Sequence, residues 1–339
     1  MSPRLRPLTG APPVRIVAAL AALCALSAGS VGCTSSGAAD RTTSTNTVRP
    51  ITSTSTTTTP VVAGPTLVSA GAAPRRALRF GLEEGATSTV AVTTDLAIVQ
   101  KAPAGDQTVD PPPVTQKIEY RVAKVDADGA TISFEVLDAS ITSAGTDLTP
   151  TEVVELTGAL KPLIGIRGTG HLSRQGRLTG ASFTLPRGLD PDVRRQVAEL
   201  PAQLGALTPG LPDEPVGVGG SWTTTDTTAP AGVEATQTTT YVVTAIEGDV
   251  VSYRATTRVK ADRQVLPAGA FSKLPGVTAT LVSSDLTGSG RGRLRLDRPV
   301  SAGQATVSGL QVVEVAAAKV APQRLDQEVR VATRCREIT

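Results

Sequence analysis

The chain has 339 residues, of which 40% are hydrophobic but only 2% are aromatic. This length suits one large domain or two modest ones, and the core must be built from Val, Leu, Ile and Ala. A single histidine, His171, excludes a multi-histidine metal site, and three cysteines cannot form a zinc cluster or a disulfide framework. Residues 1–32 hold three arginines and no acid, so the remaining basic and acidic side chains balance at 30 each. A nucleic-acid partner would require a basic surplus, and none is predicted.

The N-terminal segment, residues 1–32, is predicted to be a secretory signal peptide. Its arginines come first, and an apolar run from Ile16 to Val31 follows, with small residues near its end. This order is typical of an export signal, and the run is too short for a membrane-spanning helix.

The junction Gly32–Cys33 resembles the lipobox of bacterial lipoproteins, in which the cysteine thiol receives diacylglycerol and becomes the new N-terminus. We therefore expect Cys33 to be the lipidation site, although Ser30 occupies a position where leucine is usual. The alternative is ordinary cleavage after Ser30. In that case Cys33 can pair with Cys335 in a disulfide, because the compartment is oxidising.

Residues 33–74 are predicted to form a flexible tether rich in Thr, Ser and Pro. They show no hydrophobic period, so they cannot bury enough surface to offset the entropy of ordering. An acylated Cys33 would hold the folded part off the outer face of the cytoplasmic membrane, and the membrane is then a partner through the anchor.

A β-hairpin is predicted in the first part of the folded region. Apolar residues alternate over Ile118–Val122 and Ala130–Val136, and Asp128–Gly129 provides the turn. The same pattern returns 121 residues later over Tyr241–Ile246 and Val251–Thr257.

A second landmark repeats at a shift of 120 residues, where Gly168-Thr-Gly170 matches Gly288-Ser-Gly290. Two landmarks in the same order indicate an internal duplication. The predicted organisation is a first β-rich half over 78–207, a connector over 208–220 and a second β-rich half over 221–333.

Helices are few in the predicted fold. A capping box at Thr149–Glu152 starts one helix, and Asp190–Leu204 carries the apolar stripe of another. Most other periodic segments alternate by two, as strands do. We therefore expect a β-rich α+β protein with antiparallel sheets in two similar halves and a few short helices.

Several turn and packing motifs carry a family resemblance. They are Leu160-Lys-Pro-Leu-Ile-Gly165, Gln175-Gly-Arg-Leu178 and the proline- and glycine-rich run Leu211–Trp222. With the Gly–Cys signal and the tether, this order resembles a family of bacterial, actinobacterial-type exported lipoproteins known only as a domain of unknown function. The resemblance spans about residues 78–333. It implies an envelope location and a two-part β-rich fold, and it implies neither an activity nor site residues.

Motifs that carry chemistry are sparse. His171 would have to act with a nucleophile, but no Gly-x-Ser-x-Gly elbow exists after the signal. Asp126-x-Asp128-Gly129 begins like a calcium loop without its later ligands, and a hairpin turn explains it. The Gly-x-Gly pairs lack the context of a phosphate loop and are typical of bulges or bends. No catalytic residue, metal ligand or cofactor is predicted, and we expect no enzyme.

One basic pattern suggests a ligand. Arg291, Arg293 and Arg295 share one face of a strand and are candidates for binding phosphate headgroups or acidic glycans. The alternative is an ordinary solvated strand face. Trp222, the single tryptophan, is expected to plug the seam between the halves, with sugar stacking as its alternative role.

The sequence thus favours a non-enzymatic binding protein of the cell envelope. Scarce large aromatics and abundant Val, Leu and Ala fit an apolar cavity for a lipid or another amphiphile. The alternative is a structural or interaction module that binds a protein or a cell-wall polymer.

Overall fold

The computed structural model describes residues 64–101, 105–143, 146, 148–184, 209–228, 233–266, 277–317 and 320–338. Cys33, most of the expected tether and the helix expected over 190–204 lie outside these residues.

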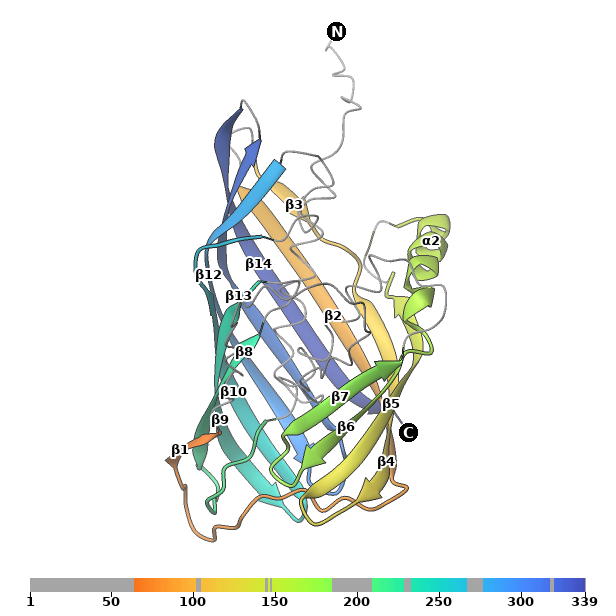
Figure 1. Cartoon of the computed structure of the whole chain (residues 1–339), viewed down its shortest axis with the longest axis vertical. Helices are drawn as coiled ribbons and strands as arrows, with labels where there is room; N and C mark the ends of the chain where they lie inside the picture. The colour runs from red at the N-terminus through yellow and green to blue at the C-terminus, as the bar shows by residue number, and fades with distance from the viewer. Residues whose placement is uncertain are drawn as a thin grey trace, which may run out of the picture.

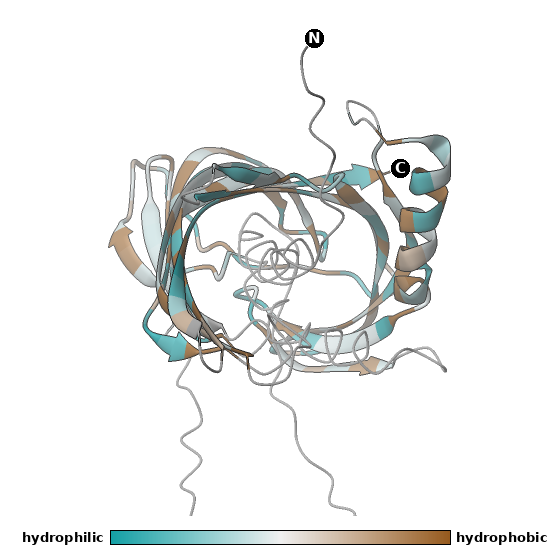
Figure 2. Cartoon of the chain, turned by 90° about the horizontal axis from the view of Figure 1, so that it is seen from above, coloured by the Kyte–Doolittle hydropathy of each residue, from teal (hydrophilic) through white to brown (hydrophobic). Residues whose placement is uncertain are grey.

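The described residues form one antiparallel sheet of fourteen strands that is open at its ends (Figure 1). Its order is β1-β8-β9-β10-β12-β13-β14-β2-β4-β5-β6-β7, with β3 paired to β2 and β11 paired to β12. Seen from above, the sheet curls round on itself (Figure 2). The strands are β1 (Thr66–Ser69), β2 (Thr87–Lys101), β3 (Gln107–Val109), β4 (Val114–Val125), β5 (Gly129–Ile141), β6 (Arg167–Ser173), β7 (Leu178–Thr184), β8 (Ser221–Thr228), β9 (Ala235–Glu247), β10 (Val250–Ala261), β11 (Gln264–Val265), β12 (Val277–Arg295), β13 (Ser301–Ala317) and β14 (Val320–Ile338).

The expected antiparallel, β-rich class is confirmed, whereas two similar halves are not. The C-terminal strand β14 pairs with β2 from Asp326 opposite Lys101 to Ile338 opposite Thr89. This long ladder joins strands from both ends of the chain, so the sheet is continuous rather than divided into two units.

Alternation of side chains gives the sheet an apolar interior face and an exposed face. In β10, Val251, Tyr253 and Ala255 are buried, whereas Arg254 and Arg258 are exposed. Buried Val, Leu, Ile and Ala from the other strands continue the interior face in three packed clusters. Such alternation is what burial of one strand face requires.

Both predicted hairpins are present, as β4–β5 and β9–β10. In the first turn the carboxylate of Asp126 accepts hydrogen bonds from the amides of Asp128 and Gly129, each at 3.0 Å. Tyr120 lies opposite Phe134 in the first hairpin, and Tyr241 lies opposite Ala255 in the second. Both pairs are related by 121 residues.

The glycine landmark keeps a different offset from the predicted one. Gly168 lies opposite Phe134, and Gly290 lies opposite Ala255. The ladder therefore relates Gly168 to Gly290 at 122 residues rather than to Gly288 at 120. The sequence match was ambiguous because β12 carries glycine at 288, 290 and 292.

Two glycines make room for aromatic rings on the neighbouring strand. A Cβ at Gly168 would collide with the Phe134 ring, and a Cβ at Gly292 would collide with the Tyr253 ring. Covering a strand glycine with a cross-strand aromatic ring is a known way to stabilise it. These glycines thus serve interior packing.

The segment Leu78–Leu82, here named the strap, crosses the interior. The Phe80 amide donates to the Arg174 carbonyl, and the Gly81 amide donates to the Leu296 carbonyl, both at 2.8 Å. Arg174 and Leu296 follow β6 and β12 and are themselves related by 122 residues. The strap therefore contacts matching points of two hairpins, β6–β7 and β12–β13.

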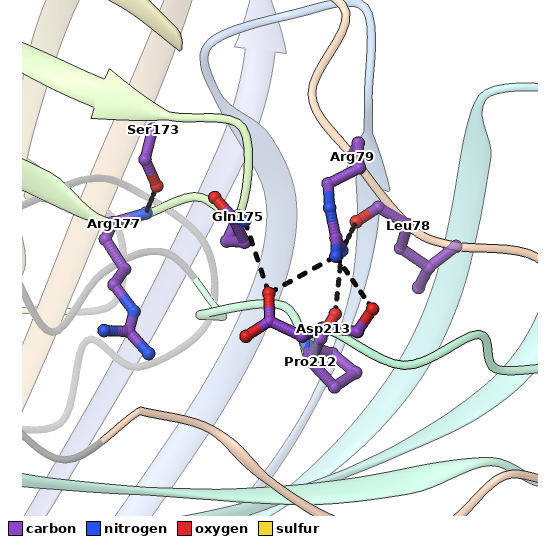
Figure 3. Close-up of polar contacts among 7 residues, drawn as sticks. All are labelled: Leu78, Arg79, Ser173, Gln175, Arg177, Pro212 and Asp213. Atoms are coloured by element: carbon purple, nitrogen blue, oxygen red, sulfur yellow. Dashed lines mark hydrogen bonds and ion pairs between the residues drawn. The ribbon is translucent and has the colours of Figure 1, made fainter. Parts of the chain in front are cut away.

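Polar contacts fasten the strap to the connector (Figure 3). The Arg79 guanidinium donates to the carbonyls of Leu78, Pro212 and Asp213, at 2.7, 2.8 and 2.8 Å. Gln175, in the β6–β7 turn, donates to the Asp213 carboxylate at 3.3 Å. Because Arg79 satisfies backbone carbonyls, we assign it a structural role.

The expected tether does not extend to residue 74. Thr66–Ser69 form β1, which pairs with β8 at the edge of the sheet. The Ala72 amide then donates to the Val218 carbonyl at 2.8 Å. Backbone pairing orders this stretch, although its composition lacks an apolar period.

The capping box is confirmed at the start of helix α2 (Pro150–Leu160), which is followed by the 3₁₀ turn η1 (Lys161–Leu163). The Thr149 hydroxyl accepts from the Glu152 amide, and the Glu152 carboxylate accepts from the Thr149 amide. No residue of α2 is buried, because the helix lies outside the curled sheet (Figure 2). Among the described residues, none of the helical segments is long and apolar enough to cross a membrane.

Candidate functional site

A hollow lined by described residues lies on the exposed face of β10, β12, β13, β14 and β2. Its volume is about 840 Å³. We name it the arginine hollow after five arginines in its lining: Arg254, Arg291, Arg330, Arg334 and Arg336.

Strand register places three of these arginines in one row across the sheet. Arg254 lies directly opposite Arg291, which lies opposite Gln304. Gln304 lies opposite Arg334, and Arg334 lies opposite Thr93. Arg336 lies two residues beyond Arg334 on β14, and therefore on the same face.

The charges of the arginine hollow are not balanced. Five arginines face one acid, Asp95, which gives the lining a net charge of +4. Arg330 lies 3.7 Å from the Asp95 carboxylate. The other four arginines form no ion pair with any side chain in the part of the chain that the structure describes. Like charges placed directly opposite each other destabilise a strand pair, so Arg254 and Arg291 carry an electrostatic cost.

The rest of the lining consists of small side chains, some with hydroxyls and some apolar, such as Ala255 and Ala305. Thr256, Ser289 and Thr306 present hydroxyls in the row beside the arginines. The Thr93 hydroxyl lies 2.9 Å from that of Thr115. The described lining holds no aromatic ring, so the hollow suits a hydrophilic, anionic ligand.

The three arginines proposed from the sequence occupy different environments. Arg291 lines the hollow, and Arg293 is exposed on the same face outside the lining. Arg295 instead makes two hydrogen bonds to the Asp297 carboxylate, at 3.0 and 2.6 Å. This pairing raises the pKa of Arg295 and lowers that of Asp297, so the charge of Arg295 is already compensated.

Sequence reasoning missed the other four arginines. Arg330, Arg334 and Arg336 are separated by even numbers of residues, so they share one strand face, as Arg291, Arg293 and Arg295 do. Ala332 interrupts the series, and this concealed the pattern. Arg254 shares the exposed face of β10 with Arg258. The two differ because the Arg258 guanidinium lies 2.6 Å from the Asp285 carboxylate.

A second hollow, of about 410 Å³, lies on the exposed face of β4, β5, β6 and β7. We name it the balanced hollow because its two arginines face two glutamates. Arg167 lies 2.8 Å from the Glu135 carboxylate. This contact raises the pKa of Arg167 and leaves its charge compensated.

The two hollows occupy matching places in their ladders. Ser133, Thr169 and Ser182 lie opposite one another in the balanced hollow. Arg254, Arg291 and Gln304 lie opposite one another in the arginine hollow. They follow Ser133, Thr169 and Ser182 in the sequence by 121, 122 and 122 residues, respectively.

Other sequence candidates have local structural partners. His171, on β6, places Nε2 3.2 Å from the Asp126 carboxylate. The pKa of Asp126 is lowered first by the Asp128 amide and then by this histidine. Among the described residues, no three His, Cys, Asp or Glu side chains form a group that would hold a metal ion. Cys335 is a free, buried thiol on β14.

Trp222 lies on β8 and is 1% exposed. Its ring stacks on that of Tyr241, with centroids 5.4 Å apart. It belongs to the interior cluster that also holds strap residues and residues of β4 and β5. A buried position of this kind suits packing, which is one of the two roles expected for Trp222.

No protein-family model matches the sequence, and no curated protein matches it. Among solved structures, an outer membrane channel from Pseudomonas putida F1 is 9% identical with a TM-score of 0.17, and the match covers 76% of this chain and 98% of that chain. The translocator domain of the autotransporter NalP from Neisseria meningitidis is 9% identical with a TM-score of 0.15, covering 75% and 88%. Scores this low carry no argument about function.

Proposed function

We propose that this chain is a non-enzymatic binding protein of the cell envelope, and that the arginine hollow is its binding surface. The observation that supports the proposal is a set of four arginines that lack ion-pair partners among the described residues. Arginine forks match carboxylate and phosphate groups, so the ligand is anionic.

The interior is a weaker candidate for ligand binding. An apolar cavity for a lipid or another amphiphile was the first expectation. The described interior face instead forms packed clusters that include fully buried Ile98, Leu281 and Val313. The hollow therefore favours recognition of an anionic group over recognition of an acyl chain.

An NMR titration tests this function. The mature chain, labelled with ¹⁵N, is titrated with inorganic pyrophosphate while the arginine Nε–Hε signals are followed. We expect saturable shifts of Arg254, Arg291 and Arg334 and no shift of Arg167, which is already paired. Uniform, unsaturable shifts of all arginines would contradict the proposal.

We also propose that the chain is a lipoprotein of the resembled family, anchored through Cys33 to the outer face of the cytoplasmic membrane. The Gly32–Cys33 junction after the apolar run supports this. The variant Cys33→Ala should be released into the medium or remain as an unprocessed precursor. Membrane retention at mature size would contradict lipid anchoring.

Finally, we propose that the sheet arose by duplication of a four-strand unit. The support is the shared register of β4–β5–β6–β7 and β9–β10–β12–β13, at offsets of 121 and 122 residues. Superposition of the two sets of strands in an experimental structure is the direct test. Tyr120 and Tyr241 must then occupy matching places.

A further inference from the structure

We infer that the ligand of the arginine hollow is an acidic polysaccharide: a chain that repeats an anionic group and hydroxyls, and that lies across β10, β12, β13 and β14. The inference rests on the proposed function and narrows its ligand from any anion to one chemical class.

The charge of the hollow calls for several anionic groups. Its lining carries a net charge of +4, and one carboxylate supplies a single negative charge. Even a phosphate monoester supplies no more than about two. One small anion would leave most of the arginines uncompensated.

The spacing of the arginines points to an extended ligand. Neighbouring strands lie about 4.8 Å apart, so the backbone positions of Arg254 and Arg334, three strands apart, are separated by roughly 14 Å. Arg334 and Arg336 are separated by about 7 Å along β14. A chain with repeated anions can meet these points one after another, each with a bidentate guanidinium contact.

The other lining residues select the kind of chain. Thr256, Ser289 and Gln304 offer hydrogen bonds between the arginines, which suits a ligand rich in hydroxyls. Single-stranded nucleic acid is bound largely by stacking of its bases on aromatic rings, and the described lining has none. The apolar side chains of the described lining are small, namely Pro113, Ala255, Ala305 and Ala332, and none is a large aliphatic chain of the kind that packs on an acyl chain.

The balanced hollow allows the contribution of hydrogen bonding to be separated from the contribution of charge. At the matching ladder positions it has hydroxyls, at Ser133, Thr169 and Ser182, in place of arginines, and its two arginines are balanced in number by two glutamates. It therefore serves as an internal control for hydrogen bonding without charge.

The test measures binding of oligogalacturonates of increasing length to the full mature chain by calorimetry. We expect affinity to rise by at least about tenfold from the monomer to the hexamer, because each added uronate meets a further arginine. The gain should shrink at high salt. Maltohexaose, which is neutral, should bind far more weakly.

Matched variants assign the binding to the hollow. Arg254→Gln, Arg291→Gln and Arg334→Gln should each weaken hexamer binding by about tenfold or more, the loss expected for a charge-assisted contact. Arg121→Gln, in the balanced hollow, should leave binding unchanged.

The outcomes separate this inference from the proposed function. Equal affinity for monomer and hexamer, with pyrophosphate still bound at the hollow, would overturn the polysaccharide while leaving an anion site. Polyphosphate or oligothymidylate binding at least as tightly as the hexamer would also overturn the ligand class. Absence of binding by every anion, pyrophosphate included, would overturn both.

Discussion

The arginine hollow and the balanced hollow share a position in the ladder and differ in chemistry. In each, residues on three neighbouring strands face one another in the same register. The arginine hollow has more arginines than acids, whereas the balanced hollow has two arginines and two glutamates and presents hydroxyls at the matching positions. Interior residues hold the register, so exposed residues at matching positions are free to change.

The largest expected effect comes from the interior beneath the second ladder. Trp222→Ala should lower the free energy of unfolding by roughly 3–5 kcal/mol, because it removes a buried ring and leaves a cavity. Guanidinium unfolding measures the change. Val68→Ala, at a side chain that is 66% exposed, is the control and should change stability by less than about 0.5 kcal/mol. Equal effects of both variants would show that Trp222 is not packed as described.

Glycine substitutions test the contact between a glycine and an aromatic ring in each ladder. Gly168→Ala and Gly292→Ala should each cost about 1–3 kcal/mol, because the new methyl group displaces an aromatic ring on the adjacent strand. Thermal and chemical unfolding measure both variants. Gly158→Ala in α2 meets no atom within 4 Å and should be neutral or stabilising. A neutral effect of either variant would show that the neighbouring ring is not packed against that glycine as described.

The turn of the first hairpin should make stability depend on pH. Amide and histidine contacts lower the pKa of Asp126, so its ionised form stabilises the folded state. That contribution is complete above the unfolded pKa of about 3.9 and is lost as pH falls through the lower folded pKa. Asp126→Ala should therefore reduce Tm at neutral pH and converge with the parent in strong acid.

The smallest effect concerns the exposed face. Arg254→Gln should stabilise the fold slightly, by roughly 0.2–1 kcal/mol at low salt, because it relieves repulsion from Arg291. The gain should fade as salt screens the charges. Ser133→Gln, at the matching position, should show no salt-dependent change. Unfolding curves at two salt concentrations are sufficient, and a destabilised Arg254→Gln would contradict the described contact.

Local features of the fold were predictable, and long-range ones were not. The hairpin at Asp128–Gly129 and the capping box at Thr149 depend on neighbouring residues, and both were correctly predicted. The β14–β2 ladder joins residues as far apart as Ile338 and Thr89. Nothing local specifies such a pairing, so the single sheet was missed.

The candidate site followed the same rule. Alternation showed that Arg291 is exposed, but it did not reveal which side chains lie beside it. The neighbours Arg254 and Gln304 depend on cross-strand register, and the paired state of Arg295 depends on the turn that positions Asp297. Residue spacing along one strand predicts which side chains share a face, but cross-strand register determines which of them lie side by side in a site.

The strap has a consequence for the order of folding. Its hydrogen bonds join Phe80 to Arg174 and Gly81 to Leu296, which lie 94 and 215 residues apart in the sequence. Closing loops of this length costs entropy that only fully formed hairpins repay. Docking of the strap is therefore a late kinetic step, slower than formation of either hairpin. Pulse-labelled hydrogen exchange should show the amides of Phe80 and Gly81 gaining protection after those of β4–β5 and β9–β10.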